Sequence, residues 1–464
     1  MNEKALKRAA LYIKDWLRFQ YERGDTPGFV VAIAHKGKIV FNEAYGYANL
    51  EKAEKLTPQH LFRIASHSKT FTATAIMQLQ EQGKLRIDDY AVNYLPWLGQ
   101  HKDKRWQKVT IRQLLSHGAG VIRDGPKNDF WNVEEPFPSE SKFKNDILES
   151  NLVIDNNTRL KYSNYGYTLL GMIVAEVSGK PYNQYVIENI MRPLGLKNTG
   201  PELEQKIEKN LVTGYSLLGP HKKRLPIVQI DTQAMSPATG FYSNAEDLCK
   251  YFSAHMAGSG KLLSDESKKE MQRAHWQAQN ASVKTEYGLG LEIEYANEHR
   301  LLGHGGGFPG HITQSYFDPE QKLVVVVLTN ATGSWAGHIA KNAIKVLEYF
   351  QNNNRAPKWA KYQGRYMNLW WNVDIVAVGN KLVAATTDVW EPFEQPSELE
   401  HLKGNAFKIS KTDSFGSADE TVEFKLADGG RVEKMIYAGS TMLPEKEYIR
   451  RMSKKRLIGQ GMVD

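Results

Sequence analysis

The order of apolar and polar positions predicts three helices in the first 180 residues of this 464-residue chain. Near its start, Leu6, Trp16 and neighbouring apolar residues recur at the spacing of an amphipathic helix, which we expect to end at Gly24. The same spacing predicts a helix that follows residue 69 and stops at Gly83, and a buried helix over 168–177 that is closed by a glycine.

Runs rich in β-branched residues and bounded by turn residues predict an antiparallel sheet. We expect its strands at 29–34, 39–45, 289–295, 312–317 and 323–328. A helix over 338–350 should cover part of this sheet, and residues 66–230 should form a mostly helical lobe. The predicted fold class is therefore mixed α/β (α+β), with a site in the cleft between sheet and lobe.

The composition changes after the polar segment 351–354. Short runs that alternate apolar and polar residues, separated by Gly and Asp turns, predict a small all-β barrel or sandwich there. The chain is therefore predicted to contain two domains, residues 1–352 and 356–464. Three tryptophans of the second domain are interpreted as core residues, with a ligand pocket as the alternative: Trp370, Trp371 and Trp390.

Candidate chemistry begins with the sequence Ser66-His67-Ser68-Lys69. Residues three apart lie on one side of a helix, so the Ser66 hydroxyl and the Lys69 amine can meet at the start of the second predicted helix. A serine is a weak nucleophile until a neighbour accepts its proton, and a desolvated lysine can be neutral often enough to do so. The helix N-terminus would also favour an oxyanion formed beside Ser66.

The Ser-x-x-Lys pattern alone is weak, because it also occurs at Ser139/Lys142 and Ser141/Lys144 in a polar run that we interpret as a solvated surface. A single occurrence of this pattern is more commonly a serine and a lysine that lie on the surface and have no catalytic role. The pattern at Ser66 therefore needs support from other parts of the chain.

Two later stretches supply that support. Tyr162 and Asn164 stand just before the third predicted helix, and His304 opens a glycine-rich run that precedes a turn and a buried strand. Other Tyr-x-Asn matches, at Tyr295 and Tyr366, fall in strand-like runs and are set aside.

In this order, Ser-x-x-Lys, Tyr-x-Asn and His-x-Gly resemble the three motifs of the serine β-lactamases and penicillin-binding DD-peptidases, and within them the class C-like branch. The resemblance covers residues 25–350 and includes framework stretches such as Leu114-Leu115-Ser116-His117-Gly118. It implies a β-lactamase/transpeptidase-like catalytic domain with an antiparallel sheet and a helical lobe. The second domain more loosely resembles the lipocalin-like barrels attached to some D-aminopeptidase relatives.

The resemblance implies a role for each matched side chain of the reaction centre. Ser66 would be the acylated nucleophile and Lys69 its partner. Tyr162 would shuttle protons, as general base when its phenol is held ionised by positive neighbours and as general acid toward the leaving group.

Substrate binding is assigned by the same resemblance to four residues: Asn164, His304, Gly305 and Gly307. Asn164 would orient Lys69 and the substrate amide. The backbone N–H groups of Ser66 and Gly307, the latter on a presumed edge strand, would form the oxyanion hole.

His304 departs from the lactamase pattern, in which a permanently charged lysine holds the substrate carboxylate. A histidine, with an ordinary pKa of about 6.5, gives a weaker and pH-sensitive hold. Relatives with His-x-Gly include D-aminopeptidases and esterases, so action on a peptide or an ester is favoured over efficient penicillin hydrolysis. If its charge holds substrate, carboxylate binding should weaken between about pH 6 and 8, whereas a structural histidine would leave the profile unchanged.

Composition and other motifs exclude several classes of function. The formal charge of +8 is scattered and not gathered into stripes, which disfavours nucleic-acid binding. The glycines after His304 fit neither phosphate-binding pattern, and the lipase interpretation fails because no Gly-x-Ser-x-Gly elbow is present. With no His-Glu-x-x-His motif and a single cysteine, we expect no metal and no other cofactor.

The charged start of the sequence lacks the apolar core of a secretion signal, and no run is long and apolar enough to span a bilayer. We therefore expect a cytoplasmic protein that does not bind membranes, whose partner is a small-molecule or short-peptide substrate. A homo-oligomer is left open.

Two hypotheses of different class follow. The first is a β-lactamase-related serine hydrolase that forms an acyl-enzyme on Ser66 and acts on small amides or esters, as a D-aminopeptidase, a carboxypeptidase or an esterase would. Penicillin binding or weak β-lactamase activity is a variant of this hypothesis. The second is a non-catalytic relative that binds a ligand through its barrel.

Overall fold

The computed structural model describes residues 1–279, 284–387, 390–413, 416–452, 457–458 and 461–462. The chain forms two compact units. One is Tyr21–Lys341, and the other combines the two ends of the chain, Met1–Gln20 and Asn342–Asp464.

The first unit is built on an antiparallel sheet with the strand order β3-β2-β1-β13-β12-β11-β10-β9-β8. Its strands are β1 (Gly28–His35), β2 (Lys38–Asn49), β3 (Glu54–Lys55), β8 (Trp276–Gln277), β9 (Glu286–Tyr287), β10 (Glu292–Ala296), β11 (His299–Phe308), β12 (His311–Asp318) and β13 (Leu323–Thr329). Every residue of β1 and β13 is buried, as their nearly continuous apolar sequences predict. The five strands expected from the sequence and the mixed α/β class are confirmed.

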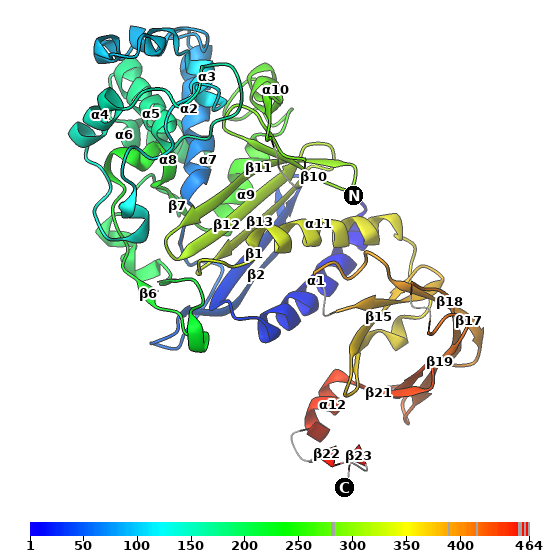
Figure 1. Ribbon diagram of the computed structural model, residues 1–464. Helices are drawn as coiled ribbons and strands as arrows, with labels where there is room; N and C mark the ends of the chain where they lie inside the picture. The colour runs from blue at the N-terminus through cyan, green and yellow to red at the C-terminus, as the bar shows by residue number, and fades with distance from the viewer. Residues whose placement is uncertain (280–283, 388–389, 414–415, 453–456, 459–460, 463–464) are drawn as a thin grey trace. The chain divides into compact units, whose positions relative to one another are not determined.

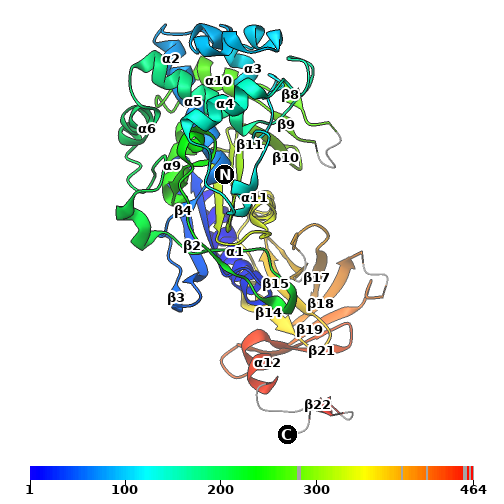
Figure 2. The same cartoon turned by 60° about the vertical axis from the view of Figure 1, so that its left-hand side comes forward.

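Helix α9 (Ala245–Ala254) packs on this sheet (Figure 1). Seven further helices form the predicted lobe, which gathers at one end of the sheet (Figure 1 and Figure 2). Its helices are α2 (Ser68–Glu81), α3 (Ile111–Leu115), α4 (Glu140–Glu149), α5 (Asn164–Ser178), α6 (Tyr182–Val186), α7 (Arg192–Leu194) and α8 (Ser236–Thr239). The unit is completed by β4 (Phe62–Arg63), β5 (Gly214–Tyr215), β6 (Pro226–Ile227), β7 (Tyr242–Ser243) and α10 (Asp265–Gln272).

Helix α2 lies at the centre of the lobe, where it packs against α5 and α8. All of its residues from Ser68 to Met77 are buried, including three threonines. The Thr70 hydroxyl donates to the His67 carbonyl at 2.8 Å and the Thr74 hydroxyl donates to the Thr70 carbonyl at 2.9 Å, so these buried groups are satisfied within the helix. A helix enclosed in this way gives Ser66, at its start, a fixed support.

The second unit contains a closed eight-stranded barrel. Its strands are β14 (Gly364–Met367), β15 (Asn372–Val378), β16 (Lys381–Thr386), β17 (Ser397–Lys403), β18 (Ala406–Lys411), β19 (Thr421–Leu426), β20 (Val432–Tyr437) and β21 (Ser440–Pro444). Pairing of β14 with β21 closes the barrel, and apolar side chains such as Ile375, Phe407 and Phe424 form its core. The predicted all-β second domain is thus a closed barrel. Short elements α12 (Glu445–Met452), β22 (Leu457–Ile458) and β23 (Gly461–Met462) follow it.

Both ends of the chain contribute helices to this unit: most of α1 (Glu3–Arg23) and most of α11 (Ala336–Asn352). Within the unit, Tyr12 of α1 lies against Phe350 and Phe393, with ring centroids 5.9 and 4.9 Å apart. The sequence predicts a single domain boundary, between residues 352 and 356. The compact units instead divide at two points of the chain, between residues 20 and 21 and between residues 341 and 342. The boundary between independent domains stays a prediction.

The tryptophans of the barrel differ from the prediction. Trp370 is 85% exposed and Trp371 is 37% exposed, on the turn between β14 and β15, and Trp390 is partly buried. The core assignment is wrong for the first two, because a hairpin tip holds its side chains outside the barrel. Among the described residues, no helix is long and apolar enough to cross a bilayer.

Candidate active site

Ser66 lies in a 3₁₀ turn, Ala65–His67, that leads directly into α2. Ala65 has a φ of +47°, a left-handed conformation that is unusual for a residue with a side chain. Such conformations persist only where the surroundings hold them, and Ala65 is completely buried. The strained residue therefore fixes the direction in which the partly buried Ser66 presents its hydroxyl.

Lys69 reaches back across one helical turn, as its spacing predicts. Its Nζ lies 3.1 Å from Ser66 Oγ and donates to the Ala238 carbonyl at 2.8 Å. Burial lowers the pKa of Lys69 to about 7, although the negative charges of Asp124 and Glu292 oppose the shift. A substantial fraction of Lys69 is therefore neutral near pH 7 and able to accept a proton.

Tyr162 approaches Ser66 from the other side. Its hydroxyl donates to Ser66 Oγ at 2.9 Å, and its ring centroid is 4.9 Å from Lys69 Nζ. Ser163 caps α5, since its hydroxyl accepts the Gly166 N–H at 2.8 Å, which places Tyr162 directly before the helix. Burial, followed by the charge of Glu292, raises the pKa of Tyr162 well above its usual range. The expected ionised phenol is therefore disfavoured, and Tyr162 is a proton donor here.

Asn164 is the first residue of α5 and is almost completely buried. Its amide nitrogen donates to Asp124 at 2.6 Å, and Lys69 donates to Ser66 and Ala238 and not to the Asn164 amide oxygen, so no direct hydrogen bond orients Lys69 through this side chain. Its amide oxygen is buried without a hydrogen-bond partner among the described residues. That oxygen is available to accept an N–H from a ligand.

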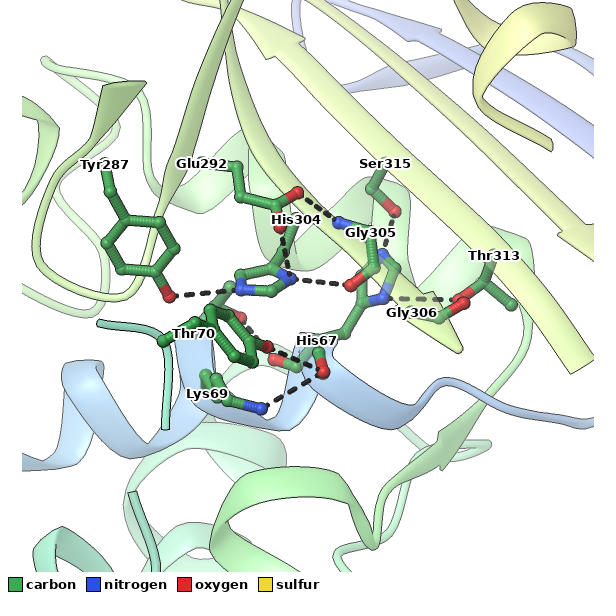
Figure 3. Close-up of polar contacts among 12 residues, drawn as sticks. His67, Lys69, Thr70, Tyr287, Glu292, His304, Gly305, Gly306, Thr313 and Ser315 are labelled. Carbon is green, nitrogen blue, oxygen red and sulfur yellow. Dashed lines mark hydrogen bonds and ion pairs between the residues drawn. The ribbon is translucent and has the colours of Figure 1, made fainter. Parts of the chain in front are cut away.

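His304 is on β11 and is only 1% exposed. Its Nδ1 lies 2.6 Å from the Gly305 carbonyl, so Nδ1 carries the hydrogen, and Nε2 accepts the hydroxyl of Tyr287 at 3.1 Å (Figure 3). Burial, and then the charge of Lys69, lower the pKa of His304 well below 6.5. The ring is therefore neutral between pH 6 and 8, and the expected pH-dependent grip on a carboxylate is not supported.

The glycines after His304 bring β11 against the Ser66 turn. A Cβ on Gly306 would lie 2.3 Å from the Ile64 carbonyl oxygen, so only glycine allows this approach. The Gly305 N–H donates to Glu292 at 2.7 Å, away from β12. Because N–H directions alternate along a strand, the Gly307 N–H points to the same side.

The pairing of β10 with β11 ends at Gly303, so β10 does not reach Gly307. The presumed edge strand is thus an interior strand of the sheet, and only its last five residues extend past β10. The end of β11 that carries Gly307 thus extends past β10, and β11 contacts the Ser66 turn, while the role of the Gly307 N–H as an oxyanion donor stays a prediction. We call Ser66, Lys69, Tyr162, His304 and Glu292 the Ser66 cluster.

Several residues of the site were missed by sequence reasoning. His117, in a framework stretch to which we assigned no function, packs 4.3 Å from Tyr162 and 4.7 Å from Tyr287 between ring centroids. Glu292 and Tyr287 come from short strands whose sequences carry no motif. Of these three residues, only His117 could have been identified from the sequence, because it belongs to the framework stretch Ser116-His117-Gly118.

The two other Ser-x-x-Lys matches lie on α4, as expected for a surface. Ser139 caps that helix, and Lys142 and Lys144 pair with Asp146 and Glu140 at 3.0 and 2.7 Å. No group of three or more His, Cys, Asp or Glu side chains suited to a metal ion occurs in the described ranges.

Comparisons with known proteins identify the family and the fold. A family model described as Beta-lactamase matches residues 13–348. Protein flp of Staphylococcus aureus (strain MW2) is 26% identical over 329 residues, which cover 69% of this chain and 63% of that protein. The chain thus spans less than two thirds of that relative's length. The putative penicillin-binding protein PbpX of Bacillus subtilis (strain 168) is 27% identical over 301 residues, 64% of this chain and 69% of the relative.

Two solved structures share the fold. The octameric penicillin-binding protein homologue from Pyrococcus abyssi has a TM-score of 0.66 and 24% identity, and the match covers 93% of this chain and 99% of that chain. D-amino acid amidase from Ochrobactrum anthropi SV3, complexed with D-phenylalanine, has a TM-score of 0.63 and 23% identity over 75% of this chain and 99% of its own.

Proposed function

This chain belongs to the Beta-lactamase family, and on that basis we propose that it is a serine hydrolase that forms an acyl-enzyme on Ser66 with small amide or ester substrates. The observation that carries the proposal is the meeting of three side chains from distant parts of the sequence. Lys69 Nζ and Tyr162 Oη lie 3.1 and 2.9 Å from the same oxygen, Ser66 Oγ. This is the arrangement that activates a serine and then protonates a leaving group.

In the first step, Ser66 Oγ attacks the substrate carbonyl carbon while its proton passes to neutral Lys69. A pKa of about 7 suits this transfer, because the group is neutral often enough to accept a proton and basic enough to hold it. The carbonyl oxygen becomes an oxyanion, which the N–H groups of Ser66 and Gly307 would stabilise. Losing one such donor typically costs roughly a hundredfold or more in rate.

In the second step, the bond to the leaving nitrogen or oxygen breaks. Tyr162, whose raised pKa keeps it protonated, donates its proton to the leaving atom and regains one from Lys69. The acyl group remains on Ser66. A water molecule then attacks the ester, gives a proton to the same relay and releases the acid, which restores the serine.

Substrate binding is proposed for the residues around this centre. The unpartnered amide oxygen of Asn164 supports a role as acceptor for a substrate N–H. Neutral His304 supports a shaping role, because its hydrogen bonds to Tyr287 and Gly305 hold the strand that carries Gly307. Hydrolysis of D-amino-acid amides, the activity after which one structural neighbour is named, is one candidate activity, and an oligomeric assembly stays a prediction.

The test compares hydrolysis of p-nitrophenyl acetate by the wild-type protein and two serine variants. Ser66→Ala should lose nearly all activity above background. Ser141→Ala is the matched control, because Ser141 also stands three residues before a lysine but lies exposed on α4. Equal activity of Ser66→Ala and the wild type would reject the proposal, and equal loss in both variants would show that the assay does not report on Ser66.

A further inference from the structure

Glu292, the first residue of β10, places a carboxylate beside the glycine-rich end of β11 (Figure 3). One oxygen, Oε2, accepts the Gly305 N–H at 2.7 Å, and the other, Oε1, lies 3.6 Å from His304 Nδ1. The Glu292 side chain is 25% exposed, whereas that of His304 is 1% exposed. The Glu292 side chain is therefore the more accessible side of this contact.

Within the part of the chain that the structure describes, no lysine or arginine forms an ion pair with this carboxylate, although the charge of Lys69 lies near enough to oppose the rise in its pKa. Lys69 directs its amine to Ser66 and to the Ala238 carbonyl, and His304 is neutral. Partly desolvated carboxylates are normally paired, because their charge is costly when it is uncompensated.

Glu294 shows the usual arrangement on the same face of the same strand. It lies two residues further along β10, forms an ion pair with Lys341 and accepts the Tyr316 hydroxyl at 3.1 Å. Glu292 thus lacks a cation at a position where its neighbour has one. A ligand with a positive charge would supply it.

The distance to the reaction centre suits a small substrate. Gly305, which holds Glu292, and Gly307, the proposed oxyanion donor, are two residues apart, so their N–H groups are separated by about 6.6 Å and point the same way. A substrate nitrogen that binds Glu292 would lie one hydrogen bond, about 2.8 Å, from its carboxylate. This leaves roughly 4 Å between that nitrogen and the substrate carbonyl oxygen that would accept the Gly307 N–H. An amino group on the carbon next to the scissile carbonyl comes close to this span.

We propose that Glu292 binds the ammonium group of the substrate, so that the hydrolase acts on α-amino acid amides, esters and peptides with a free amino group. This inference rests on the function proposed above. A carboxylate in the same place would be repelled by Glu292 whenever that side chain is ionised. An ammonium group would form a charge-assisted hydrogen bond, which is stronger than a neutral one.

The experiment measures kcat/KM for alanine p-nitroanilide, as both enantiomers, and for the N-acetylated form of each. The quantity tested is the ratio of the free-amino to the acetylated substrate, in which any general loss of activity cancels. Glu292→Gln keeps an acceptor for the Gly305 N–H but removes the charge, and it should lower the ratio roughly tenfold to a hundredfold, mainly through KM.

Glu294→Gln is the matched control, since it removes a carboxylate two residues away that already has Lys341 as its partner. Its ratio should stay within about twofold of the wild type, because the charge of Glu294 is already offset by Lys341 and its carboxylate is not the group that would bind the ammonium. A ratio that Glu292→Gln leaves unchanged, or that both variants lower equally, would overturn the inference.

A binding measurement on the Ser66→Ala variant, which should not hydrolyse the ligand, decides the question without a change at Glu292. Calorimetry should give a Kd for alaninamide at least about tenfold lower than that for N-acetylalaninamide, and equal values would overturn the inference. If the protein hydrolyses p-nitrophenyl acetate but does not prefer the free-amino alanine p-nitroanilide to its acetylated form, the role of Glu292 is rejected and the proposed function is not. Absence of any Ser66-dependent hydrolysis would reject the proposed function, and the calorimetry would still decide the ammonium site.

Discussion

Two buried polar centres of this molecule are built in opposite ways. In the barrel unit, Arg365 donates to Asp374 through two parallel hydrogen bonds of 2.8 and 2.9 Å, and both side chains are nearly inaccessible. In the Ser66 cluster, Lys69 and Glu292 carry opposite charges, yet each bonds to neutral groups.

Burial raises the pKa of the acidic group in both centres, and the centres differ in their basic group, since the pKa of Arg365 is raised, against the effect of burial, by the charges around it whereas that of Lys69 is lowered. Burial raises the pKa of Asp374 to about 6, but the charge of Arg365 and its hydrogen bonds oppose that shift. Without such a partner, burial brings the pKa of Lys69 down to about 7 and that of Glu292 up to about 7. The paired centre is suited to holding the fold, and the unpaired one is suited to exchanging protons near neutral pH.

The largest expected effect is on catalysis in the unpaired centre. Lys69→Met should lower kcat/KM for p-nitrophenyl acetate at least roughly a thousandfold, because the proton acceptor for Ser66 is lost. The free energy of unfolding should change by less than about 2 kcal/mol, since only the neutral Ser66 and Ala238 groups lose a donor. Denaturant unfolding and ester hydrolysis measured on the same preparation check both statements. A variant that retains a tenth of the activity would contradict this role.

Variants of the paired centre in the barrel unit should change the free energy of unfolding. Arg365→Met leaves Asp374 buried without its partner and should lower the free energy of unfolding by about 3 kcal/mol or more. The double variant Arg365→Met/Asp374→Leu removes both charges and should recover most of that loss. Equal destabilisation by the single and double variants in a denaturant titration would show that packing of the arginine against Phe19, 4.0 Å away, dominates over pairing.

Two neighbouring glycines test how closely β11 must approach Ser66. Gly306→Ala places a Cβ 2.3 Å from the Ile64 carbonyl, so the Ser66 turn must shift, and we expect a loss of roughly 1–3 kcal/mol in stability together with reduced activity. Gly307→Ala is the matched control for stability, because its Cβ meets only Ile312 Cδ1, at 3.8 Å. Thermal unfolding that places both variants at the same midpoint would contradict the close approach.

The smallest effect is a shift in the pH profile. Below pH 7 Lys69 is protonated and cannot accept the Ser66 proton, so kcat/KM for a neutral ester should rise about tenfold per pH unit and level off above pH 7. Glu292→Gln should move the midpoint to lower pH, because the negative charges of Glu292 and Asp124 raise the pKa of Lys69 while Arg123 lowers it. A midpoint that moves upward in this variant would contradict the assignment to Lys69.

Much of this organisation could be predicted from local sequence. The spacing of Ser66 and Lys69 fixes their contact, because three residues make about one helical turn whatever surrounds them. The buried strands and the all-β second unit were also predicted, since uninterrupted β-branched runs and alternating runs carry their own signals. Tyr162 was found because its motif directly precedes a helix.

Features that depend on three-dimensional surroundings were not predictable. The neutral state of His304 follows from burial beside Lys69, which its own sequence does not reveal. Glu292 belongs to a five-residue strand with ordinary alternation, and it acquires meaning only because its carboxylate accepts the N–H of Gly305. Trp370 was misassigned because aromatic residues are common both in cores and on turns, and only the register of β14 and β15 places it outside.

The most direct test of the central claim is to map where an acylating probe reacts. The wild-type protein treated with a fluorophosphonate should gain one adduct, which peptide mass spectrometry should place on Ser66, and Lys69→Met should react far more slowly. An adduct on another residue, or none in the wild-type protein, would contradict the account.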